Sequence, residues 1–135
     1  MVWEGGAARL LPIPIALLRL LALEYLTTRL NVGTISNMKA VELISTRVIY
    51  SGKSFADLVL WRLSEPVKGS SHQFKYRLAY VVSGKCVLRY DNEAGKGDHR
   101  HFGGKETVYP FKTPEKLLAD FQRDIARWNH ENSNA

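Results

Sequence analysis

The feature that most constrains the fold is a two-residue alternation of apolar and polar side chains, which begins at Lys39. A period of two places successive side chains on opposite faces of a β-strand. The pattern predicts about four strands, over Ala40–Tyr50, Phe55–Leu63, Phe74–Val82 and Cys86–Tyr90. In the third of these, Lys75 and Arg77 face away from the apolar side. Residues 83–85 (S-G-K) favour a tight turn, so we expect a hairpin between the last two strands.

A helical pattern follows near the end of the chain. Thr113 can cap a helix, and Pro114 suits its first turn. Apolar residues at helical spacing then predict an amphipathic helix from Pro114 to about Asn129. Sequence rich in glycine, serine or charge predicts loops over Ser64–Ser71 and Asp91–Lys105. We therefore expect the α+β class, an antiparallel meander of about four strands with the helix packed on one face.

The first 37 residues differ in composition from the rest. The stretch Leu10–Leu26 is strongly apolar, but it contains Pro12, Pro14, Arg19 and Glu24. A membrane span needs about 20 mostly apolar residues and tolerates charges poorly, so this stretch is a poor anchor and no stable membrane association is expected. It also lacks the basic start and the cleavage site of a secretory signal.

Two interpretations of this extension remain. Either a Leu-rich helix from about Ile15 to Arg29 packs on the domain or on a partner, or the natural product starts at Met38. Met38 is followed by an unbroken strand-like run, as an initiator methionine would be, so we favour that start as a hypothesis. The expected organisation is an apolar extension over residues 1–37, one α+β domain over 38–130 and a tail over 131–135.

The composition excludes several classes of protein. A chain of 135 residues has the size of one small domain, and 45% hydrophobic residues are enough for a core. The single cysteine, Cys86, excludes a disulfide scaffold and a thiol-rich metal site, and we expect it to be a buried, inert thiol. The net charge of +6 favours a polyanionic partner such as RNA, DNA or an acidic protein.

Candidate chemistry is concentrated just after the last predicted strand. The segment Arg89–His101 brings acidic, basic and imidazole groups together within a short stretch. It begins where a core strand ends, so rigid backbone would position it. If the D-H-R-H part is extended, His99 and His101 lie on one side and Asp98 and Arg100 on the other.

These residue types suit metal-independent cleavage of RNA. Such a reaction needs a general base for the ribose 2′-hydroxyl, a general acid for the leaving oxygen and a cation for the phosphorane charge. Imidazoles, with an ordinary pKa of about 6.5, can fill the first two roles. The catalytic candidates are His99, His101, Asp91, Glu93 and Lys96, and the substrate-binding candidates are Arg89, Arg100, Lys75, Arg77 and Asn92.

Two other interpretations of the histidines stay open. Histidines in a glycine-rich surface loop are often only solvated polar residues, and His99, His101 and Asp91 could instead form a two-histidine, one-carboxylate metal site. The H-x-H spacing is weak support for a metal, so we expect no metal. No cofactor motif is present, so we expect no cofactor. His72, in the Ser-rich loop, and His130, near the tail, are expected to be plain surface residues.

Four segments of the domain form a further pattern. They read K-Y-R-L-A-Y (Lys75–Tyr80), R-Y-D-N-E (Arg89–Glu93), G-K-G-D-H-R-H (Gly95–His101) and L-L-A-D-F (Leu117–Phe121). This pattern resembles the TumE-type toxins of bacterial and archaeal toxin–antitoxin pairs. The resemblance covers about Met38 to Trp128, and R-Y-D-N followed by the histidine-bearing segment is its most specific part.

The resemblance implies a small cytoplasmic protein that inhibits growth and is neutralised by a helix-turn-helix antitoxin from a neighbouring gene. The catalytic roles above rest on side-chain chemistry and not on the resemblance. Two classes of function therefore compete. In the first, the toxin is a ribonuclease in which Asp91 or Glu93 orients an imidazole and the cations hold phosphates. In the second, it is a non-enzymatic binding protein that occupies a cellular target or only its antitoxin.

Overall fold

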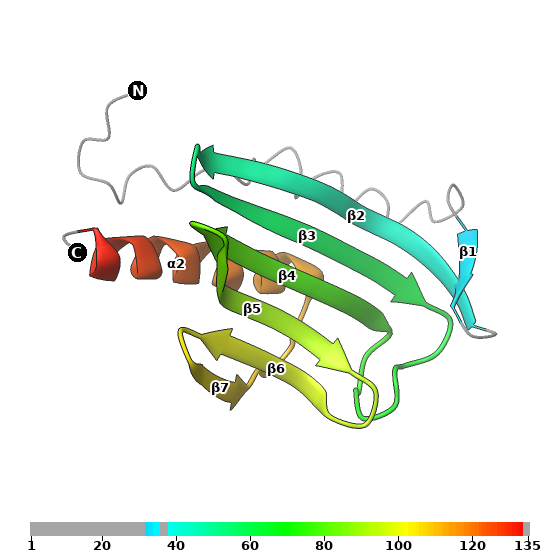
Figure 1. The fold of residues 1–135 in the computed structure, drawn as a ribbon. Coiled ribbons are helices and arrows are strands. Elements are labelled where there is room, and N and C mark those ends of the chain that lie inside the picture. Colours follow the sequence, from blue (N-terminus) through cyan, green and yellow to red (C-terminus); the bar gives the residue numbers. More distant parts are fainter. Residues whose placement is uncertain (1–31, 36–37, 134–135) are drawn as a thin grey trace.

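The computed structural model describes residues 32–35 and 38–133. These residues form a seven-stranded antiparallel meander followed by one helix (Figure 1). Each strand pairs with the next strand in the chain, so the spatial order is the chain order. The elements are β1 (Val32–Ile35), β2 (Met38–Ser51), β3 (Ser54–Leu63), β4 (Phe74–Val82), β5 (Lys85–Glu93), β6 (Gly97–Phe102), β7 (Lys105–Val108) and α2 (Pro114–Asn132). The α+β class is confirmed.

The predicted hairpin is present as β4 and β5. Ser83 and Gly84 connect the two strands with φ values of +50° and +79°. Positive φ at both central residues is what a type I′ turn requires, and this turn matches the twist of the flanking strands. Side chains alternate along β4 as expected, with Lys75 and Arg77 on the face opposite the core.

The meander is longer than predicted, with six strands between Met38 and Val108 instead of about four, and β1 as a seventh. The segment Asp91–Lys105, which we expected to be a loop, holds the end of β5, all of β6 and the start of β7. The physical reason is that its glycines terminate strands at tight turns. Gly95, Gly97 and Gly103 have φ values of +86°, +78° and +64°, respectively, which glycine adopts without a steric penalty.

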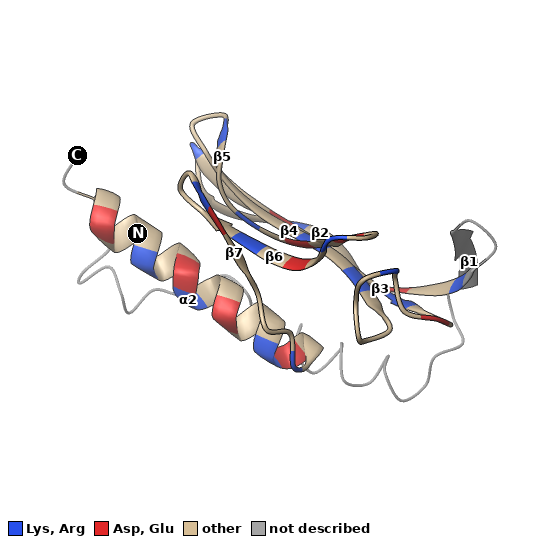
Figure 2. Ribbon diagram, turned by 90° about the horizontal axis from the view of Figure 1, so that it is seen from below, with Lys and Arg blue, Asp and Glu red and all other residues tan. Residues whose placement is uncertain are grey.

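The hydrophobic core lies between the sheet and α2. The helix contacts β4 and β5, and Figure 2 shows it lying along one side of the sheet. Thr113 caps the helix, its side-chain oxygen accepting from the backbone N–H of Lys116 at 3.1 Å. The core side chains that are almost fully buried are Tyr76, Tyr80, Tyr90, Phe121, Leu58, Leu60, Leu78, Leu88, Leu117, Leu118 and Ile125.

The other side of the sheet, here called the open face, is covered by no element among the residues that the structure describes (Figure 2). Register defines its central rows. One row runs Arg47, Asp57, Ala79, Arg89, His101, Glu106, and the adjacent row runs Ser45, Val59, Arg77, Asp91, His99, Val108. The open face is therefore where charged and imidazole side chains gather.

Cys86 is exposed, so the prediction of a buried thiol was wrong. The register between β4 and β5 shifts just after Tyr80, which pairs with Leu88, because Val81 then pairs with Cys86 and Val87 becomes the extra residue. This bulge turns Val87 inward and leaves Cys86 at the exposed start of β5.

The predicted helix over Ile15–Arg29 lies outside the described residues. At the other end, α2 continues to Asn132, a little beyond the expected end near Asn129. No helix found in residues 32–35 and 38–133 is long and apolar enough to span a membrane.

Candidate functional site

Antiparallel pairing brings five of the predicted site residues together on the open face. In the β5–β6 register, Arg89 lies opposite His101 and Asp91 lies opposite His99, and in the β4–β5 register Arg77 lies opposite Asp91. Directly opposed residues on one face have Cβ atoms about 5 Å apart. Because β6 is extended, the two imidazoles lie on the same face of the strand.

His101 lies between a cation and a carboxylate. Its Nε2 accepts a hydrogen bond from Nη2 of Arg89 at 2.9 Å, and the same Nε2 lies 3.1 Å from Oε2 of Glu106. One nitrogen cannot accept from Arg89 and donate to Glu106 at once. An unprotonated Nε2 therefore accepts from Arg89, whereas a protonated Nε2 donates to Glu106.

Glu106 is the residue of this cluster that the sequence analysis missed. It lies on β7 opposite His101, and its Oε2 is 3.4 Å from Nζ of Lys96. Desolvation acts to raise the pKa of its carboxyl, but the charges of Lys96 and His101 outweigh this effect and lower the pKa below the usual value. Because no strand was predicted at β7, no sequence signal placed Glu106 beside His101.

His99 has a different environment. Its Nδ1 lies 3.1 Å from the backbone carbonyl of Gly97, which can only accept, so Nδ1 carries the proton in the neutral ring. The other nitrogen, Nε2, is then an unprotonated acceptor. His99 and His101 thus differ in the chemistry that they offer.

Asp91 and Arg89 form a half-buried ion pair beside the imidazoles. Arg89 Nε lies 3.2 Å from Oδ2 of Asp91, and the Asp91 side chain is 10% exposed. The Arg89 guanidinium therefore connects Asp91 with His101. Glu93, two residues after Asp91 on β5, is exposed. It lies opposite Gly97 instead of a histidine.

Two predicted phosphate-binding residues lie on β4. Nζ of Lys75 donates to the backbone carbonyl of Asn92. The Arg77 side chain is exposed and makes no hydrogen bond or ion pair with the part of the chain that the structure describes. Both side chains belong to the open face.

Arg100 and Asn92 lie on the helix side of the sheet and not on the open face. Nε of Arg100 donates to Oδ2 of Asp124 at 2.5 Å, which ties β6 to α2. Asn92 is fully buried, donating to the carbonyl of Phe74 at 2.6 Å and accepting from the N–H of Tyr76 at 3.0 Å. Strand alternation separates these residues from His99 and His101.

His72 is not the plain surface residue that we expected. Its side chain is 12% exposed, and its ring stacks on Phe111 with centroids 3.8 Å apart. Nδ1 accepts from the N–H of Phe74 at 3.1 Å, so Nε2 carries the proton and donates to Oδ2 of Asp98 at 2.6 Å. His72 was misjudged because Asp98 is distant in sequence. His130 is exposed, as expected.

Asp98 collects hydrogen bonds on the helix side of β6. Besides His72, the hydroxyl of Tyr76 donates to it at 2.7 Å. Burial acts to raise the pKa of this carboxyl, but the bonds from His72 and Tyr76 lower it below the usual value overall. This cluster anchors the loop before β4 to β6.

Metal ligands are not grouped in the described ranges. No three His, Cys, Asp or Glu side chains within 32–35 and 38–133 lie close enough together to hold an ion, and the candidate trio of Asp91, His99 and His101 is among those tested.

Comparison with known sequences and structures gave one match. A family model described as Toxin TumE matches residues 20–129, so the match begins ahead of Met38, whose role as the natural start stays a prediction. No curated protein and no solved structure was found to match the chain.

Proposed function

The chain belongs to the TumE toxin family, and from this premise we propose that it inhibits growth by cleaving RNA on its open face, without a metal. Family membership indicates the toxin component of a toxin–antitoxin pair. The observation that carries the proposal is the contact of His101 with both Arg89 and Glu106, two residues along the strands from His99 and Asp91.

The two histidines take different roles in this proposal. His99 is the general base, because its unprotonated Nε2 can accept the proton of a ribose 2′-hydroxyl. His101 is the general acid, because a proton on its Nε2 is held against Glu106 at 3.1 Å and can be given to the leaving oxygen. The Gly97 carbonyl orients the His99 ring, and the charge of Asp91, which lies opposite His99, stabilises the positive charge that the ring gains.

The reaction then balances without a cofactor. The 2′-oxygen, once deprotonated, attacks the adjacent phosphorus, and the bond from phosphorus to the 5′-oxygen breaks. His101 gives its proton to the leaving oxygen, which produces a 2′,3′-cyclic phosphate and a free 5′-hydroxyl. Arg89 and Lys96 are the cations that stabilise the phosphorane.

The test is inducible expression of the wild type and of the His99→Ala and His101→Ala variants, followed by RNA end mapping. We expect each variant to lose cleavage by about 10²-fold or more and to lose toxicity, with an unchanged circular-dichroism spectrum. His130→Ala is the matched control, because this histidine is exposed on α2 and outside the site. Undiminished toxicity in both site variants would remove the proposal.

The alternative function is binding without cleavage. Ile49 and Val108 are 64% and 76% exposed, and both lie on the open face, where apolar side chains suit a protein partner. This alternative predicts growth arrest without cleaved RNA, even when both histidines are replaced.

The family also implies an antitoxin partner. We propose that this partner is a helix-turn-helix protein from the neighbouring gene and that the toxin acts in the cytoplasm. Co-expression with the neighbouring gene should relieve growth arrest, and persistent arrest would contradict this partner.

A further inference from the structure

A shallow groove lies on the open face next to the proposed catalytic residues. Its volume is about 410 Å³, and its lining includes Val59, Trp61, Lys75, Arg77, Asp91 and Glu93. It holds an aromatic ring, two cations and two carboxylates, and the cleavage chemistry proposed above uses only Asp91 of these side chains.

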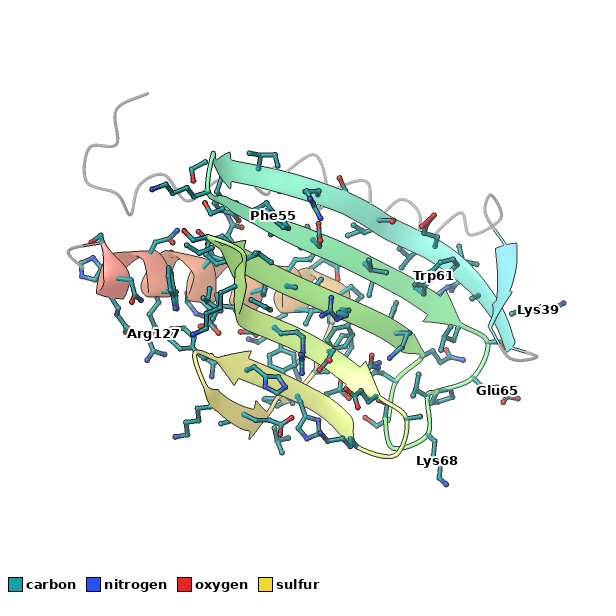
Figure 3. All side chains as sticks on the ribbon, in the orientation of Figure 1. Lys39, Phe55, Trp61, Glu65, Lys68 and Arg127 are labelled. Atoms are coloured by element: carbon teal, nitrogen blue, oxygen red, sulfur yellow. The ribbon has the colours of Figure 1, made fainter. Side chains whose placement is uncertain are left out.

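Trp61 is held firmly at one end of this groove. It is half-buried and packs against a small buried cluster of Ala40, Leu63 and Val67, separate from the main core. Figure 3 shows it near the end of β3, with Phe55 near the start of the same strand. A ring fixed on one side and partly exposed on the other is a suitable stacking platform, because little side-chain entropy remains to be lost.

The cations of the groove are placed for phosphates beside that platform. Lys75 is the cross-strand partner of Trp61, and Arg77 is the partner of Val59. Asp91 forms its ion pair with Arg89 at 3.2 Å, whereas Arg77 makes no side-chain hydrogen bond or ion pair within residues 32–35 and 38–133. An exposed guanidinium without a partner is available to an anion.

We propose that this groove is a nucleobase subsite, in which a base of single-stranded RNA stacks on Trp61 while Lys75 and Arg77 contact the flanking phosphates. The inference rests on the proposed action on RNA. From β3 to β6 is three strand spacings, about 14 Å, so an RNA strand seated on Trp61 crosses the sheet toward His99.

Glu93 adds a preference among bases. Its exposed carboxylate on the rim accepts hydrogen bonds but cannot donate them. Cytosine carries an amino group where uracil carries a carbonyl, and carboxylates accept from the cytosine amino group. The subsite therefore prefers cytosine to uracil.

Fluorescence of Trp61 tests the stacking directly. The full chain with Trp3→Phe and Trp128→Phe keeps Trp61 as its single tryptophan. Titration with the RNA hexamers of cytidylate and uridylate should quench Trp61, with the same concentration dependence as the anisotropy of a labelled hexamer. Cytidylate should bind more tightly than uridylate, and Glu93→Gln should reduce that difference.

Two substitutions on β3 provide a matched comparison. Trp61→Leu keeps apolar packing but removes the ring face, and it should weaken hexamer binding about 10-fold. Phe55→Leu should leave binding unchanged, because Arg47 already covers the Phe55 ring with its Cζ 3.8 Å from the centroid. Trp61→Phe should bind better than Trp61→Leu, which separates lost stacking from lost packing.

The outcomes distinguish the two proposals. If the wild type binds and cleaves RNA but Trp61 is not quenched, or Trp61→Leu binds as well as the wild type, the subsite is overturned and the proposed function stands. Equal affinity for both hexamers would remove the role of Glu93. If the wild type neither binds nor cleaves RNA, the proposed function fails and the subsite fails with it.

Discussion

At the scale of single residues, the protonation of His101 connects the structure with the proposed chemistry. Arg89 requires an unprotonated Nε2, whereas Glu106 requires a protonated one, and both groups lie within 3.1 Å of that atom. The titratable and charged groups around the ring are Arg89, Glu106, Lys96, Asp91 and His99. Glu106 is thus a positioning residue that accepts from the proton-bearing Nε2 of the general acid.

Replacing Glu106 by Gln tests this role. The amide keeps the size of the side chain but lacks the negative charge, so the proton-bearing Nε2 of His101 loses its charged partner. The value of kcat at neutral pH should fall about tenfold, with little change in KM. Glu115→Gln, on α2 and away from the open face, is the control. An unchanged kcat, or a rise in KM that accounts for the whole loss, would contradict the role of Glu106.

Asp98 makes stability depend on pH at the same scale. The pKa of this carboxyl is lower in the folded protein than its ordinary value, since His72 and Tyr76 donate to the charged form. The contribution of this group to the free energy of unfolding is therefore complete above the unfolded-state pKa of about 4. It is lost as pH falls through the folded-state pKa, because protonation then favours the unfolded chain.

We expect urea denaturation of the wild type to show a falling midpoint below about pH 4. The Asp98→Asn variant should be less stable than the wild type at neutral pH and should lose less stability on acidification. Asp57→Asn, which removes an exposed pair with Arg47, is the control. Equal acid sensitivity of the wild type and Asp98→Asn would show that Asp98 does not carry the effect.

At the scale of elements, β6 shows how a strand without an apolar face is stabilised. Its sequence reads G-D-H-R-H-F, and polar side chains point to both sides. On the helix side, Asp98 bonds to His72 and Arg100 bonds to Asp124, while His101 bonds to Arg89 on the open face. Pairing with β5 and β7 satisfies the backbone, so cross-strand and helix contacts replace hydrophobic alternation.

Arg100 separates structural from catalytic roles within this element. Asp124 is buried, and removing its guanidinium partner leaves a carboxylate without a cation, held by the hydroxyl of Tyr90 at 2.5 Å. We expect Arg100→Ala to lower the free energy of unfolding by about 2 kcal/mol in urea denaturation. At temperatures where the variant is folded, its kcat/KM for RNA should stay within about twofold of the wild-type value. The control Arg123→Ala, whose side chain is 69% exposed, should cost less than about 1 kcal/mol. A large loss of kcat/KM in folded Arg100→Ala would return this residue to the substrate-binding set.

At the scale of the whole molecule, the sheet separates stability from function. Its helix side holds the main core and the paired carboxylates of α2, whereas the open face holds the imidazoles and the cations proposed for RNA. Because α2 contacts the sheet on the opposite side, we expect substitutions of exposed open-face side chains such as Arg77 to change binding with little effect on folding.

Salt dependence measures how many phosphates this face neutralises. If Lys75, Arg77 and Arg89 each contact one phosphate, the plot of log Kobs against log salt should have a slope of about −2 for single-stranded RNA. The double variant Lys75→Ala, Arg77→Ala should reduce the magnitude of the slope by about 1.4, whereas Lys53→Ala, at the β2–β3 turn, should leave it unchanged. Fluorescence anisotropy between low and moderate salt measures both. A slope that the double variant leaves unaltered would place the RNA elsewhere.

Local sequence was sufficient for the main elements of the domain. Hydrophobic alternation marked β2 to β5, the S-G-K turn marked the β4–β5 hairpin, and Thr113–Pro114 marked the start of α2. The two-residue spacing of His99 and His101 put them on one side if their segment is extended, although we expected a loop where β6 lies. These features depend on the backbone and on neighbouring residues, so a single sequence contains them.

Folding settled the features that depend on contacts between distant segments. The environment of His72 depends on Asp98 and Phe111, and that of His101 depends on Glu106 in a strand that no apolar pattern marks. The bulge at Val87 similarly determined that Cys86 is exposed. Such pairings arise from strand register and helix docking, whose energies sum over many remote partners, and for this reason they cannot be inferred from any local pattern.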